Sequence, residues 1–231
     1  IYIMKVKTIS FDLWATLIKA NPEYKKHRVD FLLQHTTDKT GDDIQKVMTK
    51  IKTDIDSRVE KYGTQFDDVE LYKLLLSSLD IPETKLKAKD YMAFCHSGII
   101  SHPPLLLSQV INVLESLKVK DYRMLVASNT LFASGKIMRV VLMKLGIFEY
   151  FYDCIFSDEV GFSKPHAEFF KQIHQKSHTF AENILHTGDN SVTDMNGARN
   201  YGIQHFFVPQ GFESVETTIE LLNALEYKSK N

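Results

Sequence analysis

The sequence predicts an α/β fold: a doubly wound, mostly parallel, Rossmann-like sheet into which an all-α segment is inserted. A β-prone run at residues 6–11 ends in Asp12, residues 19–102 show only helical periodicity, and helices alternate with strands after residue 103. A chain of 231 residues is long enough for a core and a large insertion. We therefore expect a core domain of residues 1–18 and 103–231 and an inserted helical domain of residues 19–102.

The first strand is expected at residues 6–11, where β-branched and aromatic residues are typical of a strand buried on both faces. Asp12 then lies at its carboxyl end. In open α/β sheets ligands bind at that edge, where loops leave the sheet and helix N-termini point outward. A carboxylate at that edge suits binding a cation or attacking a substrate, but taken alone this stretch favours the simpler interpretation that Asp12 caps a turn.

Four helices are expected in the insertion. Asn21 is suited to an N-cap before Pro22, and Thr40 with Asp43 resembles a weakened capping box. Apolar residues from 44 to 59 recur at three- and four-residue steps, which indicates an amphipathic helix that Gly63 ends. The helices are expected to begin near Asn21, Thr40, Asp67 or Asp68, and Pro82.

Beyond residue 103, helical and strand-like patterns alternate. Strands are expected near residues 123–127, 154–156, 183–186 and 205–208. Helices are expected near residues 105–117, 134–145, 167–176, 192–201 and 215–225. This order favours a parallel sheet, so that the carboxyl ends of its strands should lie at one edge.

Composition narrows the classes of partner. A net charge of −1 supplies no basic excess for a phosphate backbone, so nucleic acid is not expected and a small-molecule substrate is. Cys95 and Cys154 form no C-x-x-C pair, and no apolar run approaches the roughly 18 residues of a membrane span. We expect a cytoplasmic protein that does not bind membranes. The sequence leaves its oligomeric state undetermined.

Polar residues follow several of the expected strands and should meet at one sheet edge. Together they supply three carboxylates, one ammonium and several hydroxyls, a combination that does not suit core packing. Clustered carboxylates require a counter-charge, and a hard cation bound through oxygen, Mg²⁺, fits best. The residues are Asp12 with Thr16, Ser128 with Asn129, Ser163-Lys164-Pro165, and Gly188-Asp189 with Asp194.

In this order and spacing the four groups resemble the motifs of the haloacid dehalogenase-like (HAD) hydrolase superfamily. One such motif would be weak evidence, whereas four in order are strong. The resemblance covers the whole chain, because the subgroup with a helical cap after the first motif also accounts for residues 19–102. It implies a hydrolase with a doubly wound core, a Mg²⁺ cofactor and a covalent aspartyl intermediate.

The resemblance also implies roles for individual residues. Asp12 would be the nucleophile, and Thr16, Ser128 and Lys164 would assist it catalytically. The metal would be bound by Asp12, the backbone carbonyl of Trp14, Asp189 and Asp194, the last directly or through water. The substrate would be bound by Trp14, Ser128, Asn129 and Lys164.

Trp14 departs from the family's phosphatases, which carry a second Asp two residues after the nucleophile as the general acid and base. An indole neither gives up nor takes a proton at neutral pH, and such help is typically worth about 10²–10⁴ in rate. The chain should therefore prefer leaving groups that need no protonation. Acyl phosphates, anhydrides, activated aryl phosphates and carbon–halogen bonds meet that condition.

Several alternatives remain open. Haloacid dehalogenases also carry an aromatic residue at this point, but Asp189 and Asp194 keep the metal-binding form of the fourth motif. In dehalogenases an arginine of the cap serves the substrate carboxylate. Asp43 stands near the place where that arginine would be sought, which leaves Arg28 and Arg58 as candidate substitutes. The family's phosphonate-cleaving branch needs a cap lysine that the sequence does not single out. A protein that binds phosphorylated ligands without turnover is a further alternative, against which the retained nucleophile argues.

His166 is a candidate for a substitute proton donor, because it follows Lys164-Pro165 where the family often has Asp. The favoured interpretation is an exposed histidine that starts a helix.

Overall fold

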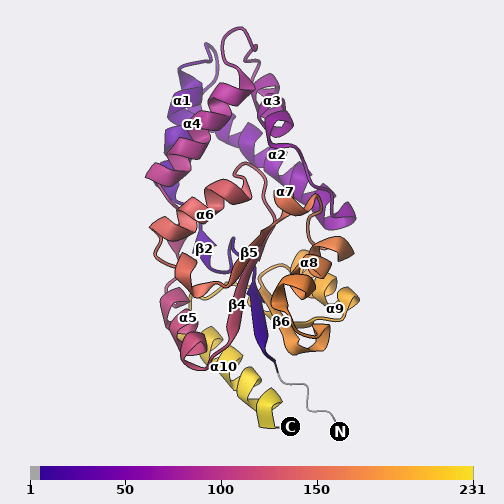
Figure 1. Cartoon of the computed structure of the whole chain (residues 1–231). Helices are drawn as coiled ribbons and strands as arrows, with labels where there is room; N and C mark the ends of the chain where they lie inside the picture. Colours follow the sequence, from indigo (N-terminus) through magenta and orange to yellow (C-terminus); the bar gives the residue numbers. More distant parts are fainter. Residues whose placement is uncertain (1–5, 231) are drawn as a thin grey trace.

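The computed structural model describes residues 6–230, with side chains through residue 226, and its centre is a five-stranded parallel sheet (Figure 1). β1 lies in the middle between β4 and β6, and β5 and β7 form the edges. The order β5-β4-β1-β6-β7 is doubly wound, as the sequence predicts. The strands are β1 Thr8–Phe11, β4 Arg123–Ser128, β5 Asp153–Phe156, β6 Ile184–Gly188 and β7 Gln204–Phe207.

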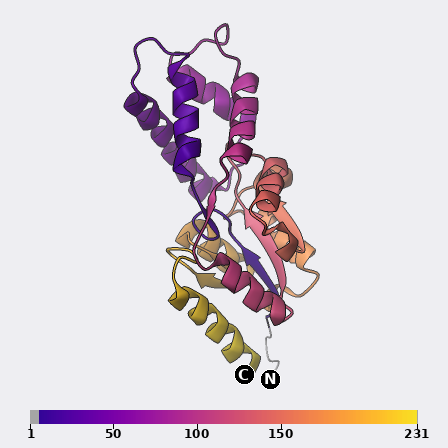
Figure 2. The ribbon, with the colours of Figure 1, turned by 90° about the vertical axis from the view of Figure 1, so that its left-hand side faces the viewer.

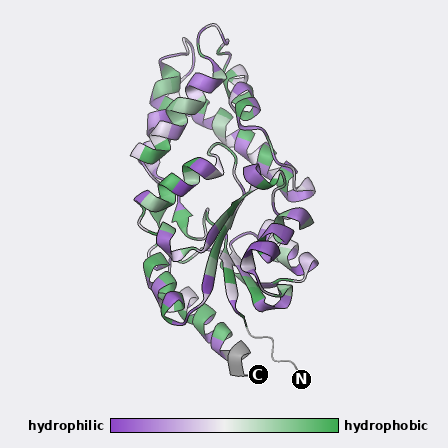
Figure 3. Ribbon diagram, in the orientation of Figure 1, coloured by the Kyte–Doolittle hydropathy of each residue, from purple (hydrophilic) through white to green (hydrophobic). Residues whose placement is uncertain are grey.

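Helices cover both faces of the sheet. In β4, Met124 and Val126 pack in a cluster with residues of α5, α6 and α10, whereas Leu125 and Ala127 pack with α8 and α9. Because successive side chains of a strand point to opposite faces, residues 124–127 of β4 are all apolar, and most of the strand is green in Figure 3. The helices are α5 Val110–Val119, α6 Gly135–Lys144, α7 Ser157–Val160, α8 Ala167–Ser177, α9 Gly197–Tyr201 and α10 Val215–Lys230.

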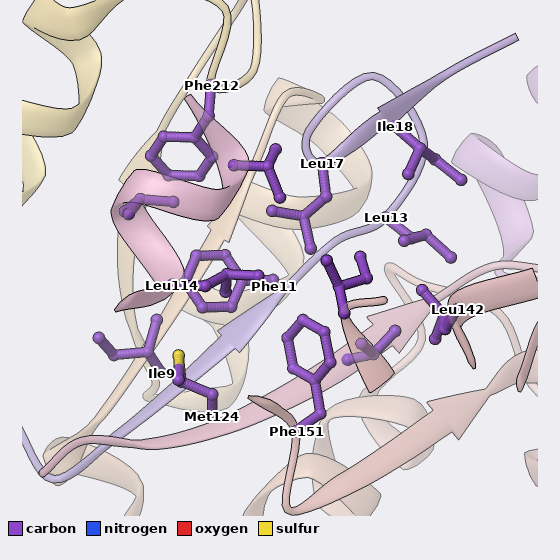
Figure 4. Packing of buried hydrophobic residues seen from close by; sticks show 14 of the residues in the cluster. Ile9, Phe11, Leu13, Leu17, Ile18, Leu114, Met124, Leu142, Phe151 and Phe212 are labelled. Atoms are coloured by element: carbon purple, nitrogen blue, oxygen red, sulfur yellow. The ribbon is translucent and has the colours of Figure 1, made fainter. Parts of the chain in front are cut away.

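Phe11 is the centre of the larger core cluster (Figure 4). Its ring meets Phe151 and Phe212 edge to face, at centroid distances of 6.4 and 5.9 Å. Leu13 and Leu17, on the loop after β1, are buried in the same cluster. The residues on either side of Asp12 are thus held by the core, which fixes the backbone that carries the carboxylate.

Four helices of residues 22–101 pack together at the end of the molecule opposite the termini, and we call them the helical segment (Figures 1 and 2). They have their own apolar cluster, separate from the two clusters against the sheet. This agrees with the helical periodicity of the insertion. The helices are α1 Pro22–Leu33, α2 Gly41–Tyr62, α3 Asp68–Ser78 and α4 Ala88–Ser101.

The capping signals in this segment are confirmed with one exception. Thr40 and Asp43 form a reciprocal capping box at the start of α2, and Gly63 ends it with a φ of 61°. The expected helix start at Pro82 is wrong, because α4 begins at Ala88. The amides of residues 85 and 86 both donate to the Pro82 carbonyl, which closes a turn that the extended residue 87 interrupts.

A short antiparallel ribbon joins the two places where the chain passes between the sheet and the helical segment. β2 Ile18–Lys19 pairs with β3 Leu105–Leu106, and the amide of Leu107 donates to the carbonyl of Leu17. Residues 105–106 were expected to begin a helix, which instead starts at Val110.

Among residues 6–230, no helix has the length and apolar character needed to span a bilayer. Cys95 and Cys154 are both buried free thiols.

Candidate active site

The site lies at the carboxyl ends of the three middle strands, where the strand order changes direction. Asp12 follows β1, Ser128 ends β4 and Asp189 follows β6. The Asp12 amide donates to the Thr187 carbonyl, so the first residue after β1 is still tied to the neighbouring strand. The parallel sheet thus brings together residues more than a hundred positions apart, as the sequence predicts.

Lys164 is the electrostatic centre of the site. Its Nζ lies 2.7 Å from Asp12 Oδ1 and 2.7 Å from Asp194 Oδ1, and its side chain is 1% exposed. The Asn129 amide holds the lysine backbone from both sides, because Lys164 N–H donates to Asn129 Oδ1 at 2.8 Å and Asn129 Nδ2 donates to the Lys164 carbonyl at 3.0 Å. The ammonium is therefore fixed between two carboxylates.

Burial and charge shift the pKa values of these groups in different directions. Burial raises the pKa of Asp12 to about 7, because the neighbouring Asp194 and Asp189 add repulsion and the Lys164 ammonium offsets only part of it. Burial alone would also raise the pKa of Asp194. The Lys164 ammonium and a hydrogen bond from His186 outweigh it and hold the pKa of that carboxyl well below its usual range. Burial and Asp194 raise the pKa of Asp189.

The three carboxylates form a candidate cation site. Asp12, Asp189 and Asp194 each offer an oxygen within 4.8 Å of the others. Asp189 is half-buried and accepts a hydrogen bond from Thr16 Oγ1 at 3.4 Å. One ammonium does not neutralise three carboxylates, and carboxylate oxygens are the donors that Mg²⁺ prefers. The donor set therefore fits the hard divalent cation expected from the sequence.

A π-helical segment, Ser191–Asn196, places Asp194. Asn190 caps it, because its Oδ1 accepts from the amides of Val192 and Thr193. The Asn190 amide donates in turn to Asp194 Oδ2 at 3.0 Å. A Cβ at Gly188 would collide with the Asp194 carboxyl group, so the close approach of this carboxylate requires glycine there.

The sequence analysis missed a buried pair beneath the site, Ser10 and His186. They are register partners on β1 and β6, with Ser10 Oγ 2.8 Å from His186 Nδ1. His186 Nε2 lies 3.1 Å from Asp194 Oδ1, and both Ser10 and His186 are fully buried. Burial lowers the pKa of His186, so the neutral ring donates from Nε2 to Asp194 and accepts from Ser10 at Nδ1. Two polar residues inside strands expected to be buried were the available signal.

The remaining candidate residues line a cavity of about 510 Å³ above Asp12. Trp14, Ser128 and Asn129 are in its wall, and Ser128 Oγ donates to the Asn129 carbonyl at 3.2 Å. Thr16 is buried beside Asp189. The volume falls in the usual range for small-molecule sites.

The helical segment supplies the far wall of the cavity. Arg28 of α1 is in that wall, whereas Arg58 is exposed on α2 and is not a lining residue. Asp43 is bonded to Thr40 at the start of α2. His166 caps α8 by accepting from the Glu168 amide and stacks on Phe162 at 4.2 Å, which confirms that it starts a helix.

Side-chain hydrogen bonds also join the helical segment to the loops of the sheet, from α2 and from the connection between α2 and α3. Glu60 Oε1 accepts from Asn190 Nδ2 at 2.8 Å, beside the residue that positions Asp194. Ser163 Oγ donates to Gln65 Oε1 at 2.9 Å, next to Lys164. The position of the helices is thus coupled directly to two of the loops that carry the charged groups.

Comparison with known proteins identifies the family. The model of the haloacid dehalogenase-like hydrolases matches residues 7–208. The glyceraldehyde 3-phosphate phosphatase of Methanocaldococcus jannaschii is 26% identical over 198 residues, which cover 86% of this chain and 82% of that protein.

Among solved structures, YfnB from Bacillus subtilis, bound to magnesium, has a TM-score of 0.72 at 18% identity and covers 96% of this chain and 99% of its own. The L-2-haloacid dehalogenase from Xanthobacter autotrophicus, with chloropropionic acid covalently bound, has a TM-score of 0.63 at 14% identity. It covers 94% of this chain and 88% of its own. At these identities the two structures show a shared fold. With the family match spanning most of its length, the chain belongs to the haloacid dehalogenase-like hydrolases.

Proposed function

We propose that the chain is a Mg²⁺-dependent phosphatase that hydrolyses a small phosphorylated metabolite through an aspartyl-phosphate at Asp12. One observation carries the proposal: Lys164 bonds Oδ1 of Asp12, whereas Oδ2 has no hydrogen-bond donor in the described part of the chain and Asp12 lines the cavity. A carboxylate held at one oxygen and open at the other is arranged for attack. The sequence similarity to a phosphatase supports the same class of reaction.

In the first step, Asp12 Oδ2 forms a bond to phosphorus while the bond between phosphorus and the leaving oxygen breaks. The electron pair of that bond departs with the leaving group. Ser128 and Asn129 lie in the cavity wall. There the Ser128 hydroxyl and the second N–H of the Asn129 side-chain amide bind phosphoryl oxygens. Water then attacks the phosphorus, the bond between phosphorus and Oδ2 breaks, and the electron pair returns to Asp12 as a carboxylate. The phosphate leaves with the oxygen and both protons of the water.

The metal would be held by Asp12, Asp189 and the carbonyl of Trp14, with Asp194 as the fourth group. Asp194 Oδ1 already accepts from Lys164 and His186, and its Oδ2 accepts from the Asn190 amide. One lone pair therefore remains at Oδ2 for a cation or for a water bound to it. When bound, Mg²⁺ supplies positive charge that neutralises the carboxylates and the charge that develops on the phosphoryl oxygens.

The helical segment, within residues 19–102, acts in this proposal as a cap. It closes the cavity over Asp12 and supplies the wall that contacts the leaving group. Exclusion of bulk water protects the aspartyl-phosphate until the leaving group has departed. The side chains of α1 and α2 in the wall then determine which substrate enters.

Trp14 sets the expected substrate preference, because the cavity wall carries an indole where a proton donor would serve a poor leaving group. With Mg²⁺, acetyl phosphate and 4-nitrophenyl phosphate should be hydrolysed with kcat/KM at least about 10²-fold above that for alkyl monoesters such as glycerol phosphates. Phosphate release across this panel, with Mg²⁺ and with chelator, measures the difference.

The same panel decides between the alternatives. Halide release from 2-haloacids in chelator would favour a dehalogenase, a branch that also carries an aromatic residue where this chain has Trp14. Saturable binding of phosphorylated ligands with no turnover of any substrate would favour a binding protein. Phosphate release that is unaffected by removal of Mg²⁺ would contradict the proposed metal.

A second prediction concerns position 14, where the family's phosphatases carry an Asp as the general acid. In Trp14→Asp, a carboxyl group replaces the indole in the cavity wall, so kcat/KM for alkyl monoesters should rise by at least about tenfold relative to that for acetyl phosphate. Trp14→Phe, which keeps an aromatic wall without a proton donor, is the matched control. An equal fall for all substrates in Trp14→Asp would show that position 14 does not govern leaving-group protonation.

A further inference from the structure

We infer that Glu60 of α2 is the general base that activates the water in the second step, the hydrolysis of the aspartyl-phosphate. This role rests on the proposed function and supplies a proton acceptor that the indole of Trp14 cannot provide. It makes the helical segment a source of a reacting group as well as a wall of the cavity.

The direction of attack defines where such a base must lie. In phosphoryl transfer the attacking and leaving oxygens lie roughly in line across the phosphorus. When the aspartyl-phosphate breaks down, the leaving oxygen is Asp12 Oδ2, so the water enters from the side of the cavity that faces away from Asp12. The helical segment forms that side. Among the described residues it contributes two carboxylates to the wall, Asp56 and Glu60.

The two carboxylates differ in what already binds them. Asp56 Oδ2 accepts from the Lys52 ammonium one turn earlier on the helix, so a cation compensates its charge. Glu60 is half-buried, and its Oε1 accepts from Asn190 Nδ2 at 2.8 Å. Its Oε2 has no hydrogen-bond donor in residues 6–226, and no cation of these residues pairs with it. Glu60 is therefore anchored at one oxygen and open to water at the other.

The end of α2 that carries Glu60 is docked on the loop of Lys164, and it lies near α7 in Figure 1. The Ser163 amide donates to the Gly63 carbonyl at 2.9 Å, three residues after Glu60. A Cβ at Gly63 would lie 2.6 Å from the Cβ of His166, so this close approach requires glycine. The backbone of Glu60 is thus positioned by the same loop that positions the ammonium.

Glu60 is also tied to the loop that carries the acidic residues. Its partner Asn190 directly follows Asp189, and the Asn190 amide donates to Asp194 Oδ2 at 3.0 Å. Oxygens of Asp12, Asp189 and Asp194 lie within 4.8 Å of one another. One residue, Asn190, therefore links the Glu60 carboxylate to this group. Glu60 thus borders the space above Asp12 in which the phosphoryl group and its water would lie.

In the step itself, Glu60 Oε2 takes one proton of the water as the water oxygen forms a bond to phosphorus. The bond between phosphorus and Asp12 Oδ2 breaks, and its electron pair returns to the Asp12 carboxylate. The protonated Glu60 then gives its proton to the departing phosphate. Because a carboxylate has no proton to give in the first step, the leaving-group preference expected from Trp14 is unchanged.

Glu60→Gln separates this role from that of a contact that only holds the helical segment in place. The amide oxygen of glutamine still accepts from Asn190, but the side chain does not take a proton from water. With Mg²⁺ and 4-nitrophenyl phosphate in stopped flow, Glu60→Gln should release one equivalent of 4-nitrophenolate at a rate within about threefold of the wild type. The phosphorylated protein should then break down about 10²-fold more slowly than the wild type turns over, which is the usual value of such assistance. Mass spectrometry should find the phosphoryl group on Asp12.

Two further variants complete the design. Glu70→Gln changes an exposed glutamate of α3 that pairs with Lys73, and it should turn over as the wild type does without accumulating the phosphorylated form. Glu60→Ala removes the base together with the hydrogen bond to Asn190, and it should also accumulate phosphorylated Asp12. If Glu60→Gln fails to fold, as judged by circular dichroism, breakdown in Glu60→Ala decides.

The role of Glu60 is overturned if phosphorylated Asp12 breaks down in Glu60→Gln within about threefold of wild-type turnover. It is also overturned if release of 4-nitrophenolate slows as much as breakdown does, because a general loss of the closed arrangement slows both steps. A wild-type protein that forms phosphorylated Asp12 and hydrolyses it independently of Glu60 would keep the proposed function and reject the base alone. A wild-type protein that releases 4-nitrophenolate with no phosphoryl group on Asp12 would reject the function itself.

Discussion

Substituting Asp12 by asparagine should lower kcat for the best phosphorylated substrate by at least about 10³-fold, the largest change expected for any single side chain. The amide keeps the size of the carboxyl group but is not a nucleophile, so no aspartyl-phosphate forms. It also removes one of the two carboxylates bonded to Lys164. Phosphate release in single- and multiple-turnover assays measures the loss.

The protein should remain folded, because Asp12→Asn also removes repulsion between Asp12 and its two acidic neighbours. Asp54→Asn, at an exposed position on α2, is the matched control and should keep full activity. Mass spectrometry should confirm that the new asparagine has not deamidated. Residual activity within about tenfold of the wild type would contradict the assignment of Asp12 as nucleophile.

Lys164→Met should have the largest effect on stability, lowering the free energy of unfolding by about 3–5 kcal/mol at pH 8 without metal. The substitution keeps an apolar stem of similar length but leaves Asp12 and Asp194 buried without the ammonium that lies 2.7 Å from each. Urea denaturation measures the change. Lys171→Met, which breaks an exposed pair with Glu168, should cost less than about 1 kcal/mol.

The cost of Lys164→Met should depend on pH in a defined direction. Burial already raises the pKa of Asp12 to about 7, and loss of the ammonium raises it further. A carboxyl group whose pKa is higher in the folded state binds more protons there than in the unfolded state, so stability falls as pH rises through that pKa. The destabilisation should therefore be smaller at pH 5.5 than at pH 8. A pH-independent cost would show that lost packing, rather than uncompensated charge, is responsible.

The parts of the fold that follow from local patterns were predictable from the sequence. Residues at the ends of parallel strands meet at one edge whatever the details of the loops, so the proximity of Asp12, Ser128, Lys164 and Asp189 followed from strand order alone. The capping box at Thr40 and the glycine after α2 were also predictable, because these signals act within a few residues.

Interactions between distant segments were not predictable in the same way. The pair of Ser10 and His186 depends on the register of two strands that are 176 positions apart. The start of α4 at Ala88 depended on a turn at Pro82 that competes with the helix signal of proline. The N-cap signal at Asn21 indicated a helix at α1, but not that Arg28 of this helix would lie between two aromatic rings at the cavity.

The ribbon of β2 and β3 has a mechanical consequence for the enzyme. Both covalent links between the sheet and the four helices pass through these paired strands, which abut the cavity at Ala20 and Pro104. Two separate connections would allow the helical segment to twist and slide against the sheet. Two hydrogen-bonded strands instead act as a single hinge. Rotation about it would shift Glu60 more than Ala20 and Pro104, which adjoin the paired strands, so opening would break the hydrogen bond between Glu60 and Asn190 before it disturbed the entrance to α1.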